Sequence, residues 1–157
     1  MYCLDTNIFL DWWERRYPPD LFPSLESEMT ALAGSAAICA PERVWEEIRH
    51  VGSSDLIAWA RANRGIFRPH DIAIQTEANA IQAKYPGLID PFARHDEADR
   101  YIIALAKLRG LVVVTHETSA RSKKNPPRSH YIPDVCAAES IRCMNFVDLM
   151  RQQKWSF

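Results

Sequence analysis

The sequence predicts an α/β protein with a central, mostly parallel β-sheet flanked by helices. Two observations lead to this fold class. Short apolar runs occur three times along the 157-residue chain, each bounded by turn or helix-start residues. Longer segments with the apolar spacing of helices lie between these runs. Strands that alternate with helices form parallel sheets, because a helical crossover lets each strand run in the same direction as the last.

Each element follows from its own pattern. The predicted strands are nearly continuous apolar runs, which is typical of strands buried on both faces, and they span residues 1–4, 36–40 and 111–115. The predicted helices span residues 23–33, 42–51, 54–63, 72–84 and 96–109, with Pro41 at the position of a first helical residue. No connecting loop is long enough to separate two units, so we expect one domain over residues 1–157.

Composition and charge are those of an ordinary globular protein. Hydrophobic residues form 47% of the chain and charged residues 25%, which excludes a disordered tail or a collagen-like repeat. The formal net charge of −1 means that a nucleic-acid partner needs a local basic patch. We recognise neither a signal peptide nor a membrane span, so we expect a cytoplasmic protein. The four cysteines form no C-x-x-C pair, which favours reduced, mostly buried thiols.

Acidic residues follow all three predicted strands. Ligands of open parallel sheets bind beyond the carboxyl ends of the strands, so these positions are the first candidates for a functional site. Asp5 follows the first strand, Glu46 and Glu47 lie after the second, and Glu117 follows the third. Each also has an ordinary interpretation: Asp5 as a helix cap, Glu47 as a helix-boundary residue and Glu117 as a loop residue.

Helix geometry separates two adjacent glutamates and singles out one aspartate. At about 100° per residue, Glu47 lies beside the apolar face of the helix that follows the second strand, whereas Glu46 points away from it. Asp99 lies within the apolar arc of the last predicted helix, where a carboxylate is costly unless its charge is compensated. The alternative for Asp99 is a capping arrangement in which Asp96 caps that helix.

Four acids could meet at one edge of such a sheet: Asp5, Glu47, Asp99 and Glu117. Crowded carboxylates repel one another and take up protons, whereas a divalent cation lets them stay ionised. Acids without a matching set of His or Cys ligands favour the hard ions Mg²⁺ and Mn²⁺. The sequence therefore predicts that these acids form a metal site.

At this point the chain resembles the PIN-domain family of metal-dependent ribonucleases, which includes the toxins of bacterial and archaeal toxin and antitoxin pairs. Four motifs in the correct order carry the resemblance: YCLDTNIFLDWW, PERVWEEI, DEADRYIIALAKLRG and LVVVTHE. The tail segment YIPDVCAAESIRCMNFVDLM is similar to a bacterial branch of that family in which I-P-D-V-C recurs. The resemblance covers nearly the whole chain and implies a PIN-like three-layer sandwich.

The resemblance also implies an activity and a set of site residues. The family's catalytic and metal-binding acids map onto Asp5, Glu47, Asp99 and Glu117, with Asn7 and Thr115 as supporting polar groups. Glu117 is a departure, because many members have Asp at that position. The implied activity is Mg²⁺- or Mn²⁺-dependent endoribonuclease cleavage by a toxin. The implied partners are an RNA substrate, a cognate antitoxin and a second copy of the chain.

An acidic cleft repels RNA, so a cationic segment must lie nearby. The densest basic stretch, RSKKNPPR, directly follows the Glu117 loop. The alternative is a solvated loop that its charges keep soluble. The predicted RNA contacts, which are independent of base sequence, are Arg121, Lys123, Lys124 and Arg128.

Three aromatic residues lie shortly after the first motif, namely Trp12, Trp13 and Tyr17. They predict a surface that binds a second copy of the chain or an antitoxin. The alternative is that they pack in the core.

Competing functions come from other classes. A PIN-like fold could act only as a catalytically silent module that binds RNA or protein. A haloacid-dehalogenase-type phosphatase also begins with a strand that ends in Asp, but Asn7 stands where it needs a second Asp. A response-regulator receiver needs a Lys after a late strand, where this chain has His116 and Glu117.

Overall fold

The computed structural model describes residues 1–90, 92–93 and 97–157 and has the predicted α/β fold. Within this part of the chain, five parallel strands form the central sheet in the order β3, β2, β1, β4, β5. The strands are β1 (Tyr2–Leu4), β2 (Ile38–Pro41), β3 (Phe67–Arg68), β4 (Val112–Val114) and β5 (Cys143–Met144).

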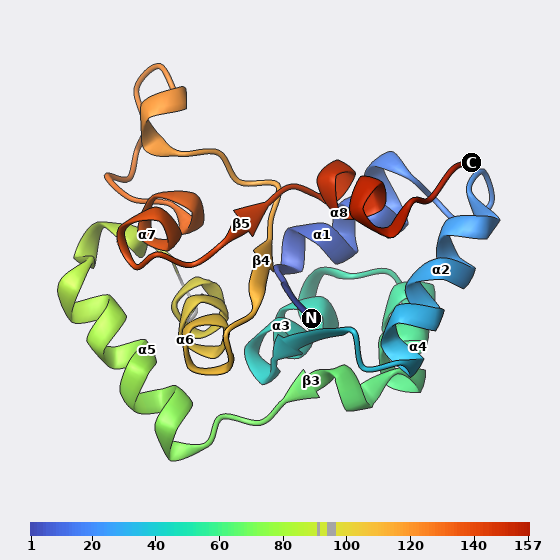
Figure 1. The fold of residues 1–157 in the computed structure, drawn as a ribbon, viewed down its shortest axis with the longest axis horizontal. Coiled ribbons are helices and arrows are strands. Elements are labelled where there is room, and N and C mark those ends of the chain that lie inside the picture. The colour runs from blue at the N-terminus through green and yellow to red at the C-terminus, as the bar shows by residue number, and fades with distance from the viewer. Residues whose placement is uncertain (91, 94–96) are drawn as a thin grey trace.

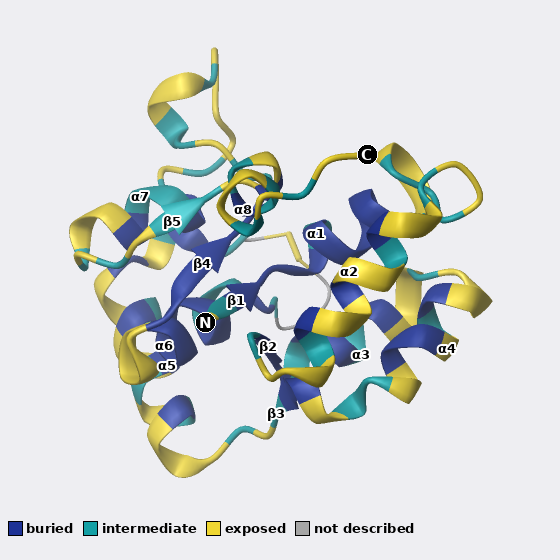
Figure 2. Cartoon of the chain, turned by 45° about the vertical axis from the view of Figure 1, so that its right-hand side comes forward, coloured by how far each residue is buried: buried dark blue, intermediate teal, exposed yellow. Residues whose placement is uncertain are grey.

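Helices connect the strands and cover both faces of the sheet (Figure 1). In Figure 2, α5 and α6 lie on one side of the sheet and α1, α2 and α3 on the other, which makes three layers. The helices are α1 (Thr6–Leu10), which continues as a wider helical turn over Asp11–Arg16, α2 (Pro23–Gly34), α3 (Glu42–Val51), α4 (Ser54–Ala62), α5 (Ile72–Lys84), α6 (Asp99–Arg109), α7 (Ile132–Ala138) and α8 (Phe146–Gln153).

The core lies between the sheet and its two helical layers. Leu4, Ile38 and Val113, from three neighbouring strands, have no exposed surface, and Ile8 of α1 and Ile102 of α6 pack in the same core. Burying a side chain of this kind contributes about 1.5–3 kcal/mol. Because helices cover both faces of the central strands, these strands are nearly continuous apolar runs in the sequence.

Helix boundaries follow the sequence pattern closely. The helices predicted at 42–51 and 72–84 begin and end at those residues. The start predicted at residue 96 lies outside the described residues, and the described helix α6 begins at Asp99. The prediction that Pro41 is the first helical residue is wrong, because Pro41 is the last residue of β2 and α3 begins at Glu42.

Other elements differ from the prediction. The strand predicted at 36–40 begins at Ile38, because Ala36 has a positive φ of 55° in the turn after α2. Strands β3 and β5 were not predicted, since a strand of two residues leaves too short an apolar run. The helices α7 and α8 were also not predicted, because they too are short.

The chain connections diverge between β1 and β4. From β1 the chain passes to α1 and α2 on one face of the sheet, whereas from β4 it passes to α7, which contacts α6 on the other face. Ligands of open α/β sheets bind at such a switch point, outside the carboxyl ends of the strands. The Asp5 N–H donates to the Val114 carbonyl over 3.0 Å, which joins the ends of the two strands there.

The aromatic residues after β1 pack mostly inward. Trp12 has no exposed surface and lies edge-on to Trp59, with ring centroids 4.8 Å apart. Trp13 and Tyr17 are half-buried, and Tyr17 contacts Phe22. Core packing therefore accounts for Trp12, while Trp13 and Tyr17 pack against the core and keep part of their surface exposed.

All four cysteines are free, as predicted, and Cys143 alone of the four is half-buried rather than buried. No helix in the described ranges is long and apolar enough to cross a bilayer.

Candidate active site

A cleft of about 600 Å³ opens beside the carboxyl ends of β1 and β4. Its lining contains the four acids from four separate parts of the chain: the end of β1, the middle of α3, the first residue of α6 and the loop after β4. The fold therefore brings to one cleft residues that lie far apart in the sequence, namely Asp5, Glu47, Asp99 and Glu117.

Asp5 is held by side-chain hydrogen bonds and does not act as a helix cap. It occupies the N-cap position of α1, but its carboxylate makes no capping hydrogen bond. The Thr115 hydroxyl donates to Asp5 Oδ2 over 2.6 Å, and the Asn7 side-chain amide donates to the same oxygen. Asp5 and Thr115 are only 5% and 2% exposed. The structure thus places both predicted supporting groups against Asp5.

Glu47 reaches from α3 toward the starts of α1 and α6. The Thr6 hydroxyl donates to one of its carboxylate oxygens, and the Ala98 N–H donates to the other over 2.9 Å. Glu46 pairs with Arg43 at the rim of the same cleft, and its side chain is 41% exposed. This arrangement agrees with the helical-face argument, which favoured Glu47 for the inward position.

Asp99 and Glu117 share the guanidinium of Arg128. Arg128 Nη1 lies 3.2 Å from Asp99 Oδ2, and Arg128 Nη2 lies 3.0 Å from Glu117 Oε1. Nη1 also donates to the Leu88 carbonyl over 2.8 Å. The second oxygen of Glu117 accepts from the Ile132 N–H at the start of α7 over 2.9 Å. Arg128 is therefore part of the cleft, and its side chain is only 15% exposed.

Burial and mutual repulsion disfavour the ionised forms of these acids. Burial, followed by the charges of Glu117 and Glu47, raises the pKa of Asp5 to about 7, although the hydrogen bond from Thr115 opposes the shift. Burial, and then the charges of Glu117 and Asp5, also raises the pKa of Asp99 well above its usual range. The positive charge of Arg128 therefore does not compensate the cluster fully, and an added cation would favour ionisation.

The donor set suits a hard divalent cation in chemical type, because carboxylate oxygens are the ligands that Mg²⁺ and Mn²⁺ prefer. In this arrangement the four side chains do not converge on one point. In the part of the chain that the structure describes, no three Asp, Glu, His or Cys side chains form a group that could hold a metal ion. Each of the four carboxylates instead bonds a hydroxyl, amide, backbone N–H or guanidinium of the protein. A cation that took three of these carboxylates as ligands would have to displace some of these partners.

The structure adds residues that the sequence interpretation did not assign to the site. Glu97 lines the cleft, with a carboxylate oxygen 3.9 Å from Arg128 Nη1. Arg43 and His50 line it from α3. They lie four residues before and three residues after Glu47, so they share its helical face, and this spacing was the signal that could have identified them.

The four predicted RNA contacts separate into two groups. Arg121 and Lys124 are exposed in the loop between β4 and α7. Lys123 is half-buried, with its ammonium 4.4 Å from the ring centre of Tyr131. Arg128 differs from the other three, because its guanidinium lies against the acids of the cleft.

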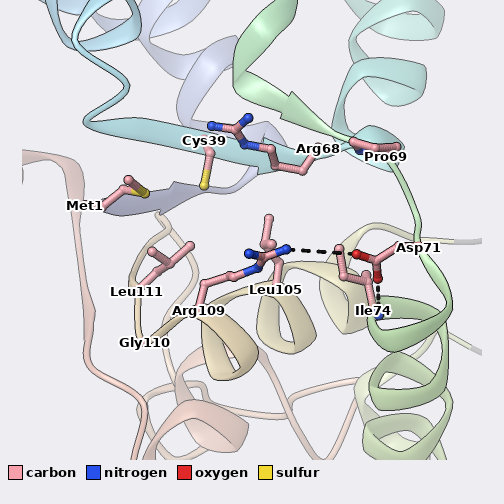
Figure 3. A pocket seen from close by; sticks show the side chains of 10 residues that line it. All are labelled: Met1, Cys39, Arg68, Pro69, Asp71, Ile74, Leu105, Arg109, Gly110 and Leu111. Carbon is pink, nitrogen blue, oxygen red and sulfur yellow. Dashed lines mark hydrogen bonds and ion pairs between the residues drawn. The ribbon is translucent and has the colours of Figure 1, made fainter.

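A second cavity, of about 550 Å³, lies beside the residues that precede β1 and β4. Figure 3 shows that Arg68 and Arg109 reach toward it and that Arg109 faces Asp71, with 4.0 Å between the charged atoms. Much of the remaining lining is apolar, and none of the four acids contributes to it. The candidate active site is therefore the carboxylate cleft.

A protein-family model with the description "Domain of unknown function (DUF4411)" matches residues 2–157. The match includes every residue of the cleft. No curated protein matches the chain.

Proposed function

The chain belongs to the DUF4411 family, and we propose that it is a metal-dependent ribonuclease whose active site is the carboxylate cleft. The main support is the convergence of four acids, from four elements, at the switch point of a parallel sheet. Burial and repulsion raise the pKa values of Asp5 and Asp99 there, and perturbed pKa values cluster at functional sites.

The acids would divide the work of holding the cation and orienting water. Asp5 and Asp99 would be the principal ligands of one or two Mg²⁺ or Mn²⁺ ions. Glu47 would be a further ligand or would orient the attacking water, and Glu117 would act through water or on a second ion. When bound, the cation would supply a water of lowered pKa and polarise the scissile phosphate.

The surrounding residues would position these groups and the RNA. The hydrogen bonds from Asn7 and Thr115 restrict the rotation of the Asp5 carboxylate. Arg121, Lys123 and Lys124 lie in the loop that follows Glu117, so they could bind backbone phosphates that lead into the cleft.

The proposed biological role is that of the toxin in a toxin and antitoxin pair. This role rests on the resemblance to PIN-domain toxins, which also implies a homodimer. Co-expression with the product of a small neighbouring gene tests it: the two proteins should co-purify, and the partner should suppress RNA cleavage.

The substitution Asp99→Asn tests the activity, because it keeps the size of the side chain and removes its charge. We expect the wild-type protein to cleave single-stranded RNA with Mn²⁺ and not with EDTA. The variant should lose Mn²⁺ binding and at least about a hundredfold of the cleavage rate. Asp148→Asn is the matched control, since the Asp148 side chain on α8 is 43% exposed and pairs with Arg151. Cleavage that persists in EDTA, or in a folded Asp99→Asn variant, would contradict the proposal.

One observation favours a second function, that of a catalytically silent module that binds RNA or protein. Arg128 already pairs with two of the acids, and no metal-binding group of three side chains is formed in the described part of the chain. A silent RNA-binding module would bind single-stranded RNA, measured by fluorescence anisotropy, without Mn²⁺-dependent cleavage.

A further inference from the structure

We propose that Arg128 is a tethered cation that occupies the metal-binding region of the cleft and that a divalent cation must displace it to bind. This inference rests on the proposed function, because it concerns the regulation of the same site. It explains why the acids share a cleft while no metal-binding group is formed among the described residues.

The Arg128 guanidinium lies between acidic side chains of two elements. Arg128 contacts Asp99 at the start of α6 and Glu117 in the loop after β4, and Glu97 is 3.9 Å away. A divalent cation ligated by Asp99 and Glu117 would lie within a few ångströms of this guanidinium. Two positive charges at that distance repel each other strongly in a partly buried site, so both cannot keep the same ligands.

Arg128 is held more firmly than an exposed ion pair. It donates to the Leu88 carbonyl, and its guanidinium lies 4.6 Å from the ring centre of Tyr131. Its carboxylate partners are only 15% and 17% exposed, so solvent screens these charges weakly. Release of Arg128 therefore has a definite free-energy cost, which metal binding must overcome.

RNA offers a second partner for the released side chain. A guanidinium binds phosphate oxygens with the same paired geometry that it uses for carboxylates. Arg128 follows the basic segment that contains Arg121, Lys123 and Lys124. When a divalent cation takes its place, Arg128 can turn from the carboxylates to a backbone phosphate of RNA in the cleft.

Metal affinity measures the competition directly, without reference to catalysis. We expect isothermal titration calorimetry to show that Arg128→Gln binds Mn²⁺ at least about tenfold more tightly than the wild type. Arg128→Lys, which keeps the charge, should stay within about threefold of the wild type. Arg121→Gln is the matched control for the loss of one positive charge from the same loop. Equal affinity in Arg128→Gln and the wild type, or weaker binding in Arg128→Gln, overturns the proposal.

A second measurement uses the wild-type chain, so it does not depend on how well the variants fold. The Arg128 Nε–Hε resonance is identified as the signal that is absent from ¹⁵N spectra of Arg128→Lys. Saturation with diamagnetic Mg²⁺ should shift this resonance, whereas the resonance of Arg151 on α8 should stay in place. An Arg128 resonance that does not move while Mg²⁺ binds overturns the displacement.

The outcomes separate this inference from the proposed function. If the wild type cleaves RNA with Mn²⁺ and binds Mn²⁺ as tightly as Arg128→Gln, only the displacement is wrong. If neither protein binds Mn²⁺ and neither cleaves RNA, both proposals are wrong. If Arg128→Gln binds Mn²⁺ well and the wild type binds it weakly, the displacement is supported.

Discussion

Asp5 shows how one residue can carry a charge that depends on its surroundings. It is 5% exposed, and hydroxyl and amide donors from Thr115 and Asn7 contact it. These donors favour the carboxylate, whereas burial and neighbouring acids favour the protonated form. The pKa of Asp5 is raised, so burial and repulsion outweigh the effect of these hydrogen bonds. Without a cation, Asp5 is therefore only partly ionised near neutral pH.

The pH dependence of stability tests this balance. The pKa of Asp5 rises from 3.8 to about 7 on folding, so between these values the folded state holds a proton that the unfolded state releases. The contribution of Asp5 to the free energy of unfolding is therefore greatest below about pH 4 and falls until about pH 7. Asp5→Asn should remove this decline and be more stable than the wild type at about pH 8.

Urea unfolding in EDTA at several pH values measures the effect. The informative quantity is the difference between the wild type and Asp5→Asn, because other groups titrate in both proteins. The prediction is wrong if this difference stays constant between about pH 4 and pH 7.

At the scale of elements, the first turn of α7 fixes the loop that carries the cleft residues after β4. Asp134 Oδ2 accepts from the Ala120 N–H and from the Tyr131 N–H, each over 2.9 Å. Glu117 accepts from the Ile132 N–H at the same turn. The I-P-D-V-C segment therefore has a structural role, because it ties the loop to α7 near the acids.

Substitution of Asp134 should loosen this loop. Asp134→Ala leaves two backbone N–H groups without their acceptor, so we expect a loss of about 1–3 kcal/mol in the free energy of unfolding. Asp134→Asn keeps one carbonyl acceptor and should lose less. Urea unfolding measures the stability, and tryptic cleavage at Arg121 to Lys124 reports the loop. Equal stability and equal cleavage in the wild type and both variants would contradict the assigned role.

The same loop should determine how RNA binding responds to salt. Replacing Arg121, Lys123 and Lys124 with Gln removes up to three phosphate contacts. The logarithm of the RNA association constant decreases with the logarithm of the salt concentration, and the magnitude of this slope should be smaller by about 2 in the variant. Fluorescence anisotropy with single-stranded RNA in EDTA measures the slope without cleavage. Replacing Arg61 and Arg151 with Gln is the control for lost charge elsewhere on the surface. An unchanged slope in the triple variant would show that this loop is only a solvated surface.

At the scale of the whole molecule, the strand order brings together acids that are distant from one another in the sequence. The residues that follow β1 and β4 meet at the centre of the sheet, while α3 and α6 bring acids to the same cleft. A cation bound there would link both helical layers. Metal binding should therefore stabilise the whole fold.

Thermal unfolding with and without Mn²⁺ tests this linkage. At a Mn²⁺ concentration of about 100 times Kd, binding to the folded state alone adds about 2.7 kcal/mol, which raises Tm by roughly 5–10 °C in a domain of this size. EDTA should reverse the increase, and Asp99→Asn should not show it. An equal increase in the wild type and Asp99→Asn would indicate that Mn²⁺ binds elsewhere.

The sequence by itself determined the class of fold, most of the long helices and the choice of Glu47 over Glu46. These features have local signatures, because burial of both sheet faces and of one helical stripe requires regular apolar spacing. The two-residue strands β3 and β5 have no such signature.

Only the tertiary structure decided where Arg128 lies. In the sequence Arg128 ends a basic segment of a kind that is typical of an exposed surface. In the fold it pairs with Asp99 and Glu117, which are 29 and 11 residues away. The direction of a long charged side chain depends on the charges and burial that distant elements bring to it, and local spacing does not encode these.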